Sequence, residues 1–518
     1  MRITRRLVPH TGRFVTALYV VSCAFAQFPP GRGPSQSSQV NQLPLSGRSG
    51  QNGSVTATES PVPGTTTSVD TINPSVQVQG PYAGSVPSGA RLPFSGKLTL
   101  RDAIERGLRY NLGTVGLAQA VRAAHGQRKA ARSALLPNLN GNLSETVQQT
   151  NLEAFGLRFR SPLPGLSIPT VVGPFNYFDL RASLSQRVAD ITAWNNYRSA
   201  NESLHANDFS AQDARDLVVL AVGGAYLQVV AAEAKVQSAR SQLETANALY
   251  RQTAQQHSVG LVAQIDVNRS RVQMLTQQQR LVSLENDFAK QKINLARMTG
   301  LPPNDRYEIT DDVPFVAAPV TSVDDALNQA FEQRSDLKAA EAQVRAAERA
   351  RSAARAERLP SLSVSADYGA IGTNPAQAHG TFAVVGSLRF PIWQGGRVEG
   401  DVEQADAALM QRRAELQDLR GHVEADVRDA YLDIQAAASQ VEVARENLKV
   451  TQQNLDLTRQ RFDAGITDNL EVVQSQESVA SAQLDYINSV FAHNVAKLSL
   501  ARATGRATEH LAQFLNLQ

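Results

Sequence analysis

No group of side chains in this sequence has the spacing that catalysis or metal binding requires. Ligands of a structural zinc site recur at short, fixed spacings, whereas the histidines here are scattered. The chain has a single cysteine, Cys23, and contains no GxxxxGK phosphate loop. We therefore expect no enzyme activity, no cofactor and no bound metal. The histidines beyond the N-terminal segment are His125, His205, His257, His379, His422, His493 and His510.

The sequence does contain a long internal repeat. Residues 225–300 and 430–505 align without insertion at a constant offset of 205. Upstream, residues 121–137 and 344–360 align at an offset of 223. A repeat of this length predicts two copies of one supersecondary unit. Each copy is expected to hold a short helix, a β-hairpin and a long helical hairpin.

Residues 1–26 have the pattern of an export signal. A basic region with four arginines precedes an apolar run at residues 14–21, and Ala24-Phe25-Ala26 provides a cleavage site. The apolar run is too short to span a bilayer. Removing the four arginines changes the net charge from +3 to −1, so the basicity belongs to the signal. No nucleic-acid partner is indicated.

The signal offers two alternative cleavage sites. Residues 20–23 loosely fit a lipoprotein cleavage site, so lipidation of Cys23 competes with cleavage after Ala26.

Residues 27–95 are rich in Pro, Gly, Ser, Thr and Gln and carry few charges. Such a segment buries too little apolar surface to offset the entropy lost on ordering. We expect it to be a disordered periplasmic extension.

Heptad repeats predict two long helical hairpins. Large residues recur every seven positions in the first copy, with alanines at the other core position. The pattern runs without proline for roughly 60 residues, which corresponds to about 90 Å of helix. Helices of this length must be covered by one another. His493 breaks the pattern, since it stands where the first copy has Phe288, and we expect it to be a core residue. The core positions are Val229, Val236, Leu243 and Tyr250, matched by Ile434, Val441, Leu448 and Leu455.

Four stretches of period-two alternation predict strands at about residues 138–150, 176–188, 361–372 and 381–393. In the third stretch, Leu362 and Val364 alternate with Ser361 and Ser363. Strands of about ten residues with one apolar face are typical of outer-membrane barrels, although a half-buried soluble sheet gives the same alternation. The export signal and the helix lengths favour the membrane. Because open edges are not tolerated in hydrocarbon, other copies must pair them, giving eight strands from two chains or twelve from three.

The duplicated unit resembles the TolC family of outer-membrane efflux proteins over about residues 98–511. Residues 258–267 (SVGLVAQIDV) are similar to the family's first helical-hairpin tip. Residues 461–465 (RFDAG) and 469–473 (NLEVV) resemble its second tip, and residues 390–397 (FPIWQGGR) resemble its strand-to-helix crossing. The first crossing, residues 186–190 (QRVAD), departs from the pattern because it lacks the Pro and the Gly-Gly.

The resemblance implies a homotrimer in the cell outer membrane, with a large periplasmic portion. Its mixed α and β fold would be a 12-stranded β-barrel, four strands per chain, that continues into an α-helical coiled-coil tunnel. Its function would be a passive exit duct for small toxic molecules or proteins, in contact with outer-membrane lipid. The energy would come from an inner-membrane pump of the RND or ABC type, joined through a periplasmic adaptor, the membrane fusion protein.

These patterns together predict the organisation of the whole chain. A signal peptide (1–26) and the extension (27–95) precede the first repeat (96–315), whose helical hairpin covers about 195–300. The second repeat (321–511) has its helical hairpin at about 397–505, and a short tail (512–518) ends the chain. The alternative function is a structural coiled-coil protein such as an adhesin stalk, which would need no barrel strands.

Six residues at the two tips are candidates for adaptor docking. A helical hairpin needs a residue that tolerates positive φ at its turn, and glycine does so at little cost. The apolar residues beside the glycines would be covered either by local packing or, as the resemblance implies, by the adaptor. The six residues are Gly260, Leu261, Val262, Ala263, Gly465 and Ile466.

Four further residues are candidates for the periplasmic constriction: Asp266, Phe462, Asp468 and Glu471. In a three-fold ring each carboxylate would appear three times and favour cations. The alternative is that these acids stabilise the positive ends of the helices that follow each turn. Phe462 and Thr467 stand where the family has an aromatic and a basic gate residue. Because the hydroxyl and the guanidinium of those gate residues are missing here, the usual gate network is in doubt.

Overall fold

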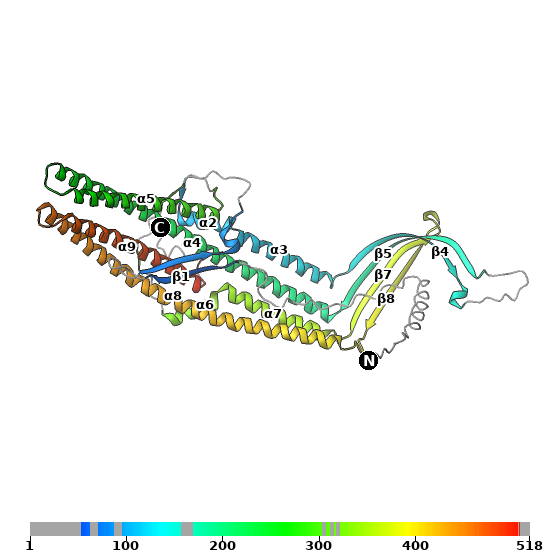
Figure 1. The fold of residues 1–518 in the computed structure, drawn as a ribbon. Helices are drawn as coiled ribbons and strands as arrows, with labels where there is room; N and C mark the ends of the chain where they lie inside the picture. Colours follow the sequence, from blue (N-terminus) through cyan, green and yellow to red (C-terminus); the bar gives the residue numbers. More distant parts are fainter. Residues whose placement is uncertain are drawn as a thin grey trace, which may run out of the picture. The chain divides into compact units, whose positions relative to one another are not determined.

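The computed structural model describes residues 53–62, 71–86, 96–156, 169–302, 307–310, 315–317, 322–505 and 507 (Figure 1). These residues form two compact units. The sheet unit consists of residues 129–197 and 350–404, and the helical unit contains the other described residues. The predicted signal, Cys23 and the tail at 512–518 lie outside the described residues.

The two copies contain the same elements in the same order. The first copy consists of α2 (Leu100–Tyr110), α3 (Leu112–Ser133), β4 (Asn138–Asn151), β5 (Val171–Ala189), α4 (Ile191–Ser258) and α5 (Gln264–Thr299). The second consists of α6 (Val323–Gln333), α7 (Ser335–Ala356), β7 (Ser361–Gly372), β8 (His379–Arg389), α8 (Arg397–Asp463) and α9 (Asn469–Ala503). Short elements are η2 (Glu153–Phe155), η3 (Pro375–Gln377) and the parallel pair β3 (Lys97–Leu98) and β6 (Glu308–Ile309).

The element bounds follow the sequence offsets. The starts of α2, α3 and β4 lie 223 residues before those of α6, α7 and β7, and α5 begins 205 residues before α9. The caps repeat as well: the Thr99 hydroxyl accepts from the Asp102 N–H at 3.1 Å, and the Ser322 hydroxyl accepts from the Asp325 N–H at 3.1 Å. Both are helix N-caps. The predicted duplication is confirmed down to the local chemistry that starts each helix.

The four long strands form one antiparallel sheet in the order β4-β5-β7-β8. The β5–β7 pair joins the two copies, and β4 and β8 lie at the two edges. Because side chains alternate along each strand, one face carries mostly Ser, Asn, Asp and Arg, and the other is apolar. The apolar face is largely exposed: eight of its large side chains are 51–77% exposed, whereas Phe178, Leu184, Leu362 and Val364 are half-buried. The eight exposed side chains are Leu139, Leu143, Val147, Leu180, Tyr368, Phe382, Val384 and Leu388.

The two strand-to-helix crossings differ, as their sequences predict. Only Asp190 separates β5 from α4, whereas seven residues separate β8 from α8. The predicted end of the fourth strand at residue 393 is wrong: β8 (His379–Arg389) stops at Arg389. Pro391 has no N–H to donate to a strand ladder, and Gly395 and Gly396 adopt positive φ. The first helical hairpin also begins at Ile191 rather than at residue 195.

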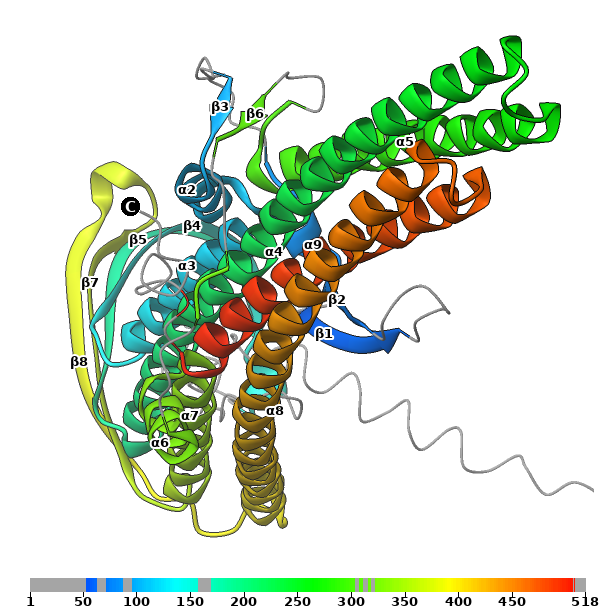
Figure 2. The same ribbon diagram turned by 90° about the vertical axis from the view of Figure 1, so that its left-hand side faces the viewer.

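The helical hairpins α4–α5 and α8–α9 lie side by side within the helical unit (Figures 1 and 2). Their core is made largely of small and β-branched residues. Ala214, Val218 and Val222 on α4 are fully buried, as are Val423 and Val427 on α8. One window of α4 is apolar enough to cross a membrane, with a mean hydropathy of 1.8, but 61% of it is buried. This window therefore belongs to the core of the helical unit.

The prediction of disorder for residues 27–95 is wrong for the part that the structure describes. β1 (Val55–Val62) and β2 (Thr71–Val78) form an antiparallel hairpin, followed by the short helix η1 (Gly80–Ala83). β2 packs on α9, and Val76 lies so close to Gly224 of α4 that a Cβ there would approach it to 2.6 Å. The few apolar residues of this segment are covered by helices that already exist, so the segment needs no core of its own.

A buried ion network joins the α6–α7 turn to α8. Arg334 is 4% exposed, and its guanidinium contacts Asp336 at 2.7 Å and Asp426 of α8 at 2.8 Å. Arg502 of α9 pairs with Asp213 of α4 beside this group. Removing one member of such a network leaves an uncompensated buried charge. The network therefore fixes the positions of the second-copy helices relative to α4.

His493 is a core residue, as expected, and its surroundings differ from those of Phe288. In the first copy, the Lys292 ammonium lies 5.4 Å from the Phe288 ring centroid and 4.6 Å from that of Tyr307. In the second copy, the equivalent Lys497 is 1% exposed, and His493 is fully buried. Burial, with a smaller contribution from Lys497, lowers the pKa of His493 to about 4. Burial lowers the pKa of Lys497 to about 8.

This burial predicts a loss of stability in acid that is specific to His493. The ordinary histidine pKa is 6.5, so between that pH and about 4 the unfolded chain binds a proton that the folded chain does not. The free energy of unfolding should fall by about 3 kcal/mol over this range. His493→Phe, which copies Phe288, should flatten this part of a plot of Tm against pH. The exposed His205→Gln should not, and an unchanged slope in His493→Phe would refute the assignment.

Candidate functional site

Each helical hairpin ends in a turn of the same construction. In the first, Gly260 has a φ of +77°, its N–H donates to the carbonyl of His257 at 2.9 Å, and the Leu261 N–H donates to Gln256 at 2.9 Å. This pair of hydrogen bonds is the Schellman motif that ends a helix at a left-handed residue. The second tip repeats it 205 residues later with Gly465 at +71°, Phe462, Ile466 and Arg461. The predicted need for positive φ at both glycines is confirmed.

The tips expose most of their apolar side chains. Leu261 is 75% exposed, Ile466 is 70% exposed and Val259 is 68% exposed. Val262 differs, since it is half-buried and its carbonyl lies 2.9 Å from the His257 Nδ1. Ala263 is exposed and occupies the N-cap of α5 without a side-chain cap. Local packing therefore accounts for Val262 but leaves Leu261 and Ile466 uncovered within the chain.

The three candidate acids all lie at helix N-termini, as the alternative interpretation expects. The Asp468 carboxylate caps α9 by accepting from the Glu471 N–H at 3.2 Å. Glu471 forms an ion pair with Arg461 at 2.9 Å and accepts from the Thr467 hydroxyl. Asp266, in the first turn of α5, pairs with Arg269 at 3.4 Å. Each acid therefore stabilises its own turn, whatever else it does in an assembly.

Phe462 is half-buried at the second tip. Its half-buried ring packs against a small cluster of Leu249, Leu455 and Val472. The ring therefore packs on a cluster that joins α8 and α9 to α4 of the first hairpin. Thr467 bonds to Glu471 of its own turn.

Polar contacts between the two hairpins were not predicted from the sequence. Close to the tips, the Gln252 amide donates to Asp463 at 3.1 Å, and the buried Asn469 amide donates to the Asp266 carbonyl at 3.1 Å. Further along, Glu477 of α9 faces three residues of α5. Its carboxylate accepts from Gln273 and Gln277 at 3.3 and 3.2 Å and pairs with Arg280 at 3.5 Å. We call this group the Glu477 tie; its α5 members recur at the spacing of one helix face.

The polar face of the sheet carries two separate groups of charges. In the middle, Arg181 of β5 pairs with Asp179 at 3.3 Å and with Asp367 of β7 at 2.7 Å. Nearer the helices, Arg187 pairs with Asp190 at 3.3 Å, and Arg389 lies at the end of β8. Among the residues that the structure describes, no group of His, Cys, Asp and Glu side chains could hold a metal ion.

Comparison with known proteins supports the family resemblance. Residues 116–301 and 326–506 match the family described as outer membrane efflux protein, one match for each repeat. The chain is 27% identical over 241 residues to the pyoverdine export outer membrane protein OpmQ of Pseudomonas putida, an alignment that covers 44% of this chain and 49% of that protein. The chain thus spans about half the length of this relative.

Two further matches extend over more of the chain. It is 22% identical over 396 residues to the outer membrane protein TolC of Vibrio cholerae, which covers 73% of this chain and 84% of that protein. The crystal structure of the CmeC outer membrane channel of Campylobacter jejuni superposes with a TM-score of 0.69 at 16% identity, covering 86% of this chain and 97% of that one. This structural match shows the fold.

The Glu477 tie predicts that one carboxylate restrains both hairpins. In Glu477→Ala, amide hydrogen exchange should accelerate in residues 264–285 and 469–485, because α5 and α9 lose their shared acceptor. Residues 415–435, in the second core cluster, should exchange as before. The matched control is Glu446→Ala, since Glu446 makes only a surface pair with Lys449. Equal exchange in Glu477→Ala and the native protein would show that the tie restrains nothing.

Proposed function

We propose that this chain, which belongs to the outer membrane efflux protein family, is the outer-membrane exit duct of a tripartite efflux or secretion system. The protein is located in the outer membrane, with a large periplasmic portion. The observation that carries the proposal is the exposed apolar face of the four-stranded sheet, opposite a polar face. An uncovered apolar surface of this extent requires a partner. Lipid is the partner that we propose, because strands of 11–19 residues are long enough to cross a bilayer.

The sheet supports a trimer. Four strands leave β4 and β8 with one unpaired side each, and a bilayer does not tolerate such edges. Pairing β8 of one copy with β4 of the next removes every edge when the ring closes. Three copies would give twelve strands, with the apolar faces outward and the polar faces around an aqueous lumen. A stalk-like structural protein has no use for a sheet with these two faces, so this alternative is disfavoured.

The helical hairpins supply the periplasmic part of the duct and its partners. The two hairpins of a chain have near-equivalent bounds, so three chains would supply six hairpins around one axis. Exposed Leu261 and Ile466 at the tips would dock a periplasmic adaptor, which connects the duct to an inner-membrane pump of the RND or ABC type. The similarity to pyoverdine export proteins supports small secreted molecules as the cargo class, beside toxic compounds and proteins.

Conductance in planar bilayers tests the duct directly. The purified protein should form ion-conducting channels, and Glu471→Ala should reduce the ratio of potassium to chloride permeability by roughly twofold, since a ring of three carboxylates is lost near the tips. Glu446→Ala, on the exposed surface of α8, should leave the ratio unchanged.

Folded protein that inserts but never conducts would contradict the proposed function. Channels with the same ion selectivity in Glu471→Ala and the native protein would contradict only the role of Glu471.

The exposed tips predict that adaptor coupling depends on their apolar character. Introducing Leu261→Asp and Ile466→Asp together should make cells as susceptible to exported compounds as a deletion strain, while conductance of the purified protein persists. The matched control is Val443→Asp, because Val443 of α8 is also exposed, at 59%, but lies far along the chain from either tip. Full resistance in the double variant would exclude these residues from docking.

A further inference from the structure

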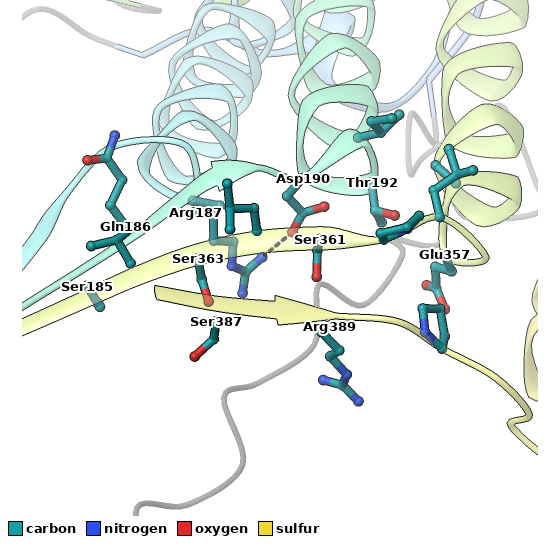
Figure 3. A pocket seen from close by; sticks show the side chains of 18 of the residues that line it. Ser185, Gln186, Arg187, Asp190, Thr192, Glu357, Ser361, Ser363, Ser387 and Arg389 are labelled. Carbon is teal, nitrogen blue, oxygen red and sulfur yellow. Dashed lines mark hydrogen bonds and ion pairs between the residues drawn. The ribbon is translucent and has the colours of Figure 1, made fainter. Parts of the chain in front are cut away.

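A hollow of about 460 Å³ lies where the sheet meets the helices (Figure 3). Its walls come from β5, β7 and β8, with contributions from the starts of β4, α4 and α8 and from the end of α7. All of these residues belong to the sheet unit. The volume is in the range of about 300–1,000 Å³ that small-molecule sites occupy. The hollow opens on the polar face of the sheet, since Ser185, Ser363 and Ser387 line it.

The strand register brings two arginines and a row of hydroxyls together in this hollow. Arg187 of β5 pairs in register with Ser363 of β7, which pairs with Ser387 of β8. In the next row on the same face, Ser361 pairs with Arg389. Figure 3 shows Arg187, Ser363, Ser387 and Arg389 along one side of these strands. Guanidinium and hydroxyl groups all offer N–H or O–H donors to an anion.

Two of the three arginine side chains that line the hollow already form ion pairs with carboxylates. Arg187 lies 3.3 Å from Asp190, whose other oxygen caps α4 through the Ala193 N–H at 2.9 Å. Arg397 contacts the buried Glu357 at 2.6 Å and Asp401 at 2.9 Å.

Arg389 has no such neighbour. Its side chain is exposed, and among the described residues no carboxylate pairs with it. Because three guanidinium groups and two carboxylates line the hollow, its lining has a net charge of +1.

We infer that this hollow binds the carboxylate group of a small anionic molecule, with Arg389 as the main contact. A guanidinium binds a carboxylate through two parallel hydrogen bonds, and Ser361 and Ser387 lie beside it to donate more. The inference rests on the proposed function in one respect: the polar face must line the duct for cargo to reach the site. In a ring of three chains the site would occur three times around the lumen, on the path of the cargo.

The location distinguishes this site from the charges farther along the sheet. The group of Asp179, Arg181 and Asp367 has two carboxylates for one guanidinium, and the arginine contacts both. An anion is therefore attracted at the helix end of the sheet and not at its middle. Such a site would hold anionic cargo briefly where the helices give way to the strands.

Citrate, a tricarboxylate, is the probe for this site. In planar bilayers, citrate should reduce the conductance of the native channel, and Arg389→Gln should raise the half-blocking concentration about tenfold, the loss expected for one charge-assisted contact. Arg389→Lys should retain part of the block, since it keeps the charge without the planar fork. The matched control is Arg358→Gln, because Arg358 pairs with Glu399 at 3.1 Å and does not line the hollow.

Calorimetric titration of citrate into the purified protein provides a readout that needs no conduction, and the binding heat should be lost in Arg389→Gln. Conducting channels that citrate neither blocks nor binds would overturn the anion site and leave the duct intact. Equal affinity for citrate in Arg389→Gln and the native protein would also overturn it, as would an equal loss in Arg358→Gln. Citrate binding without any conductance would instead contradict the duct.

Discussion

Backbone hydrogen bonding along the two edges of the four-stranded sheet is the constraint from which the assembly follows. Among the described strands, β4 and β8 each have a neighbour on one side only, and in the proposed duct their apolar side chains face hydrocarbon. Each backbone group left unpaired there costs several kcal/mol, so edges of 14 and 11 residues cannot remain open. Among the residues that the structure describes, none pairs with the outer side of β4 or β8. We therefore regard the single chain as an incomplete membrane structure that other copies complete.

The helical unit is subject to a different constraint, which is to cover the surface of its long helices. Helices of 67 and 68 residues have far more surface than a globular core can cover, so each must be covered by its neighbours. Small residues at the contacts, such as Ala214 and Ala437, let the helices approach closely. The duplication then supplies two nearly interchangeable hairpins. The copies differ at the crossings, at the tips and at His493, and at these places each copy makes its own contacts.

The sequence predicts most of the fold because its signals are local or periodic. The duplicated elements, the turn glycines Gly260 and Gly465 and the alternation in the strands all lie where the sequence places them. Other features depend on contacts between distant segments, and no periodicity reveals them. The β1–β2 hairpin is ordered because α9 and Gly224 offer a surface. Glu477 finds its partners about 200 residues away, and within the described part of the chain the strand register sets Arg389 opposite Ser361 rather than a carboxylate.

The most direct test of this account is the mass of the detergent-solubilised protein by native mass spectrometry. We expect a particle of three chains, because three copies of a four-stranded sheet close into a ring without edges. A stable particle of one chain would contradict it, since β4 and β8 would then remain unpaired in the membrane.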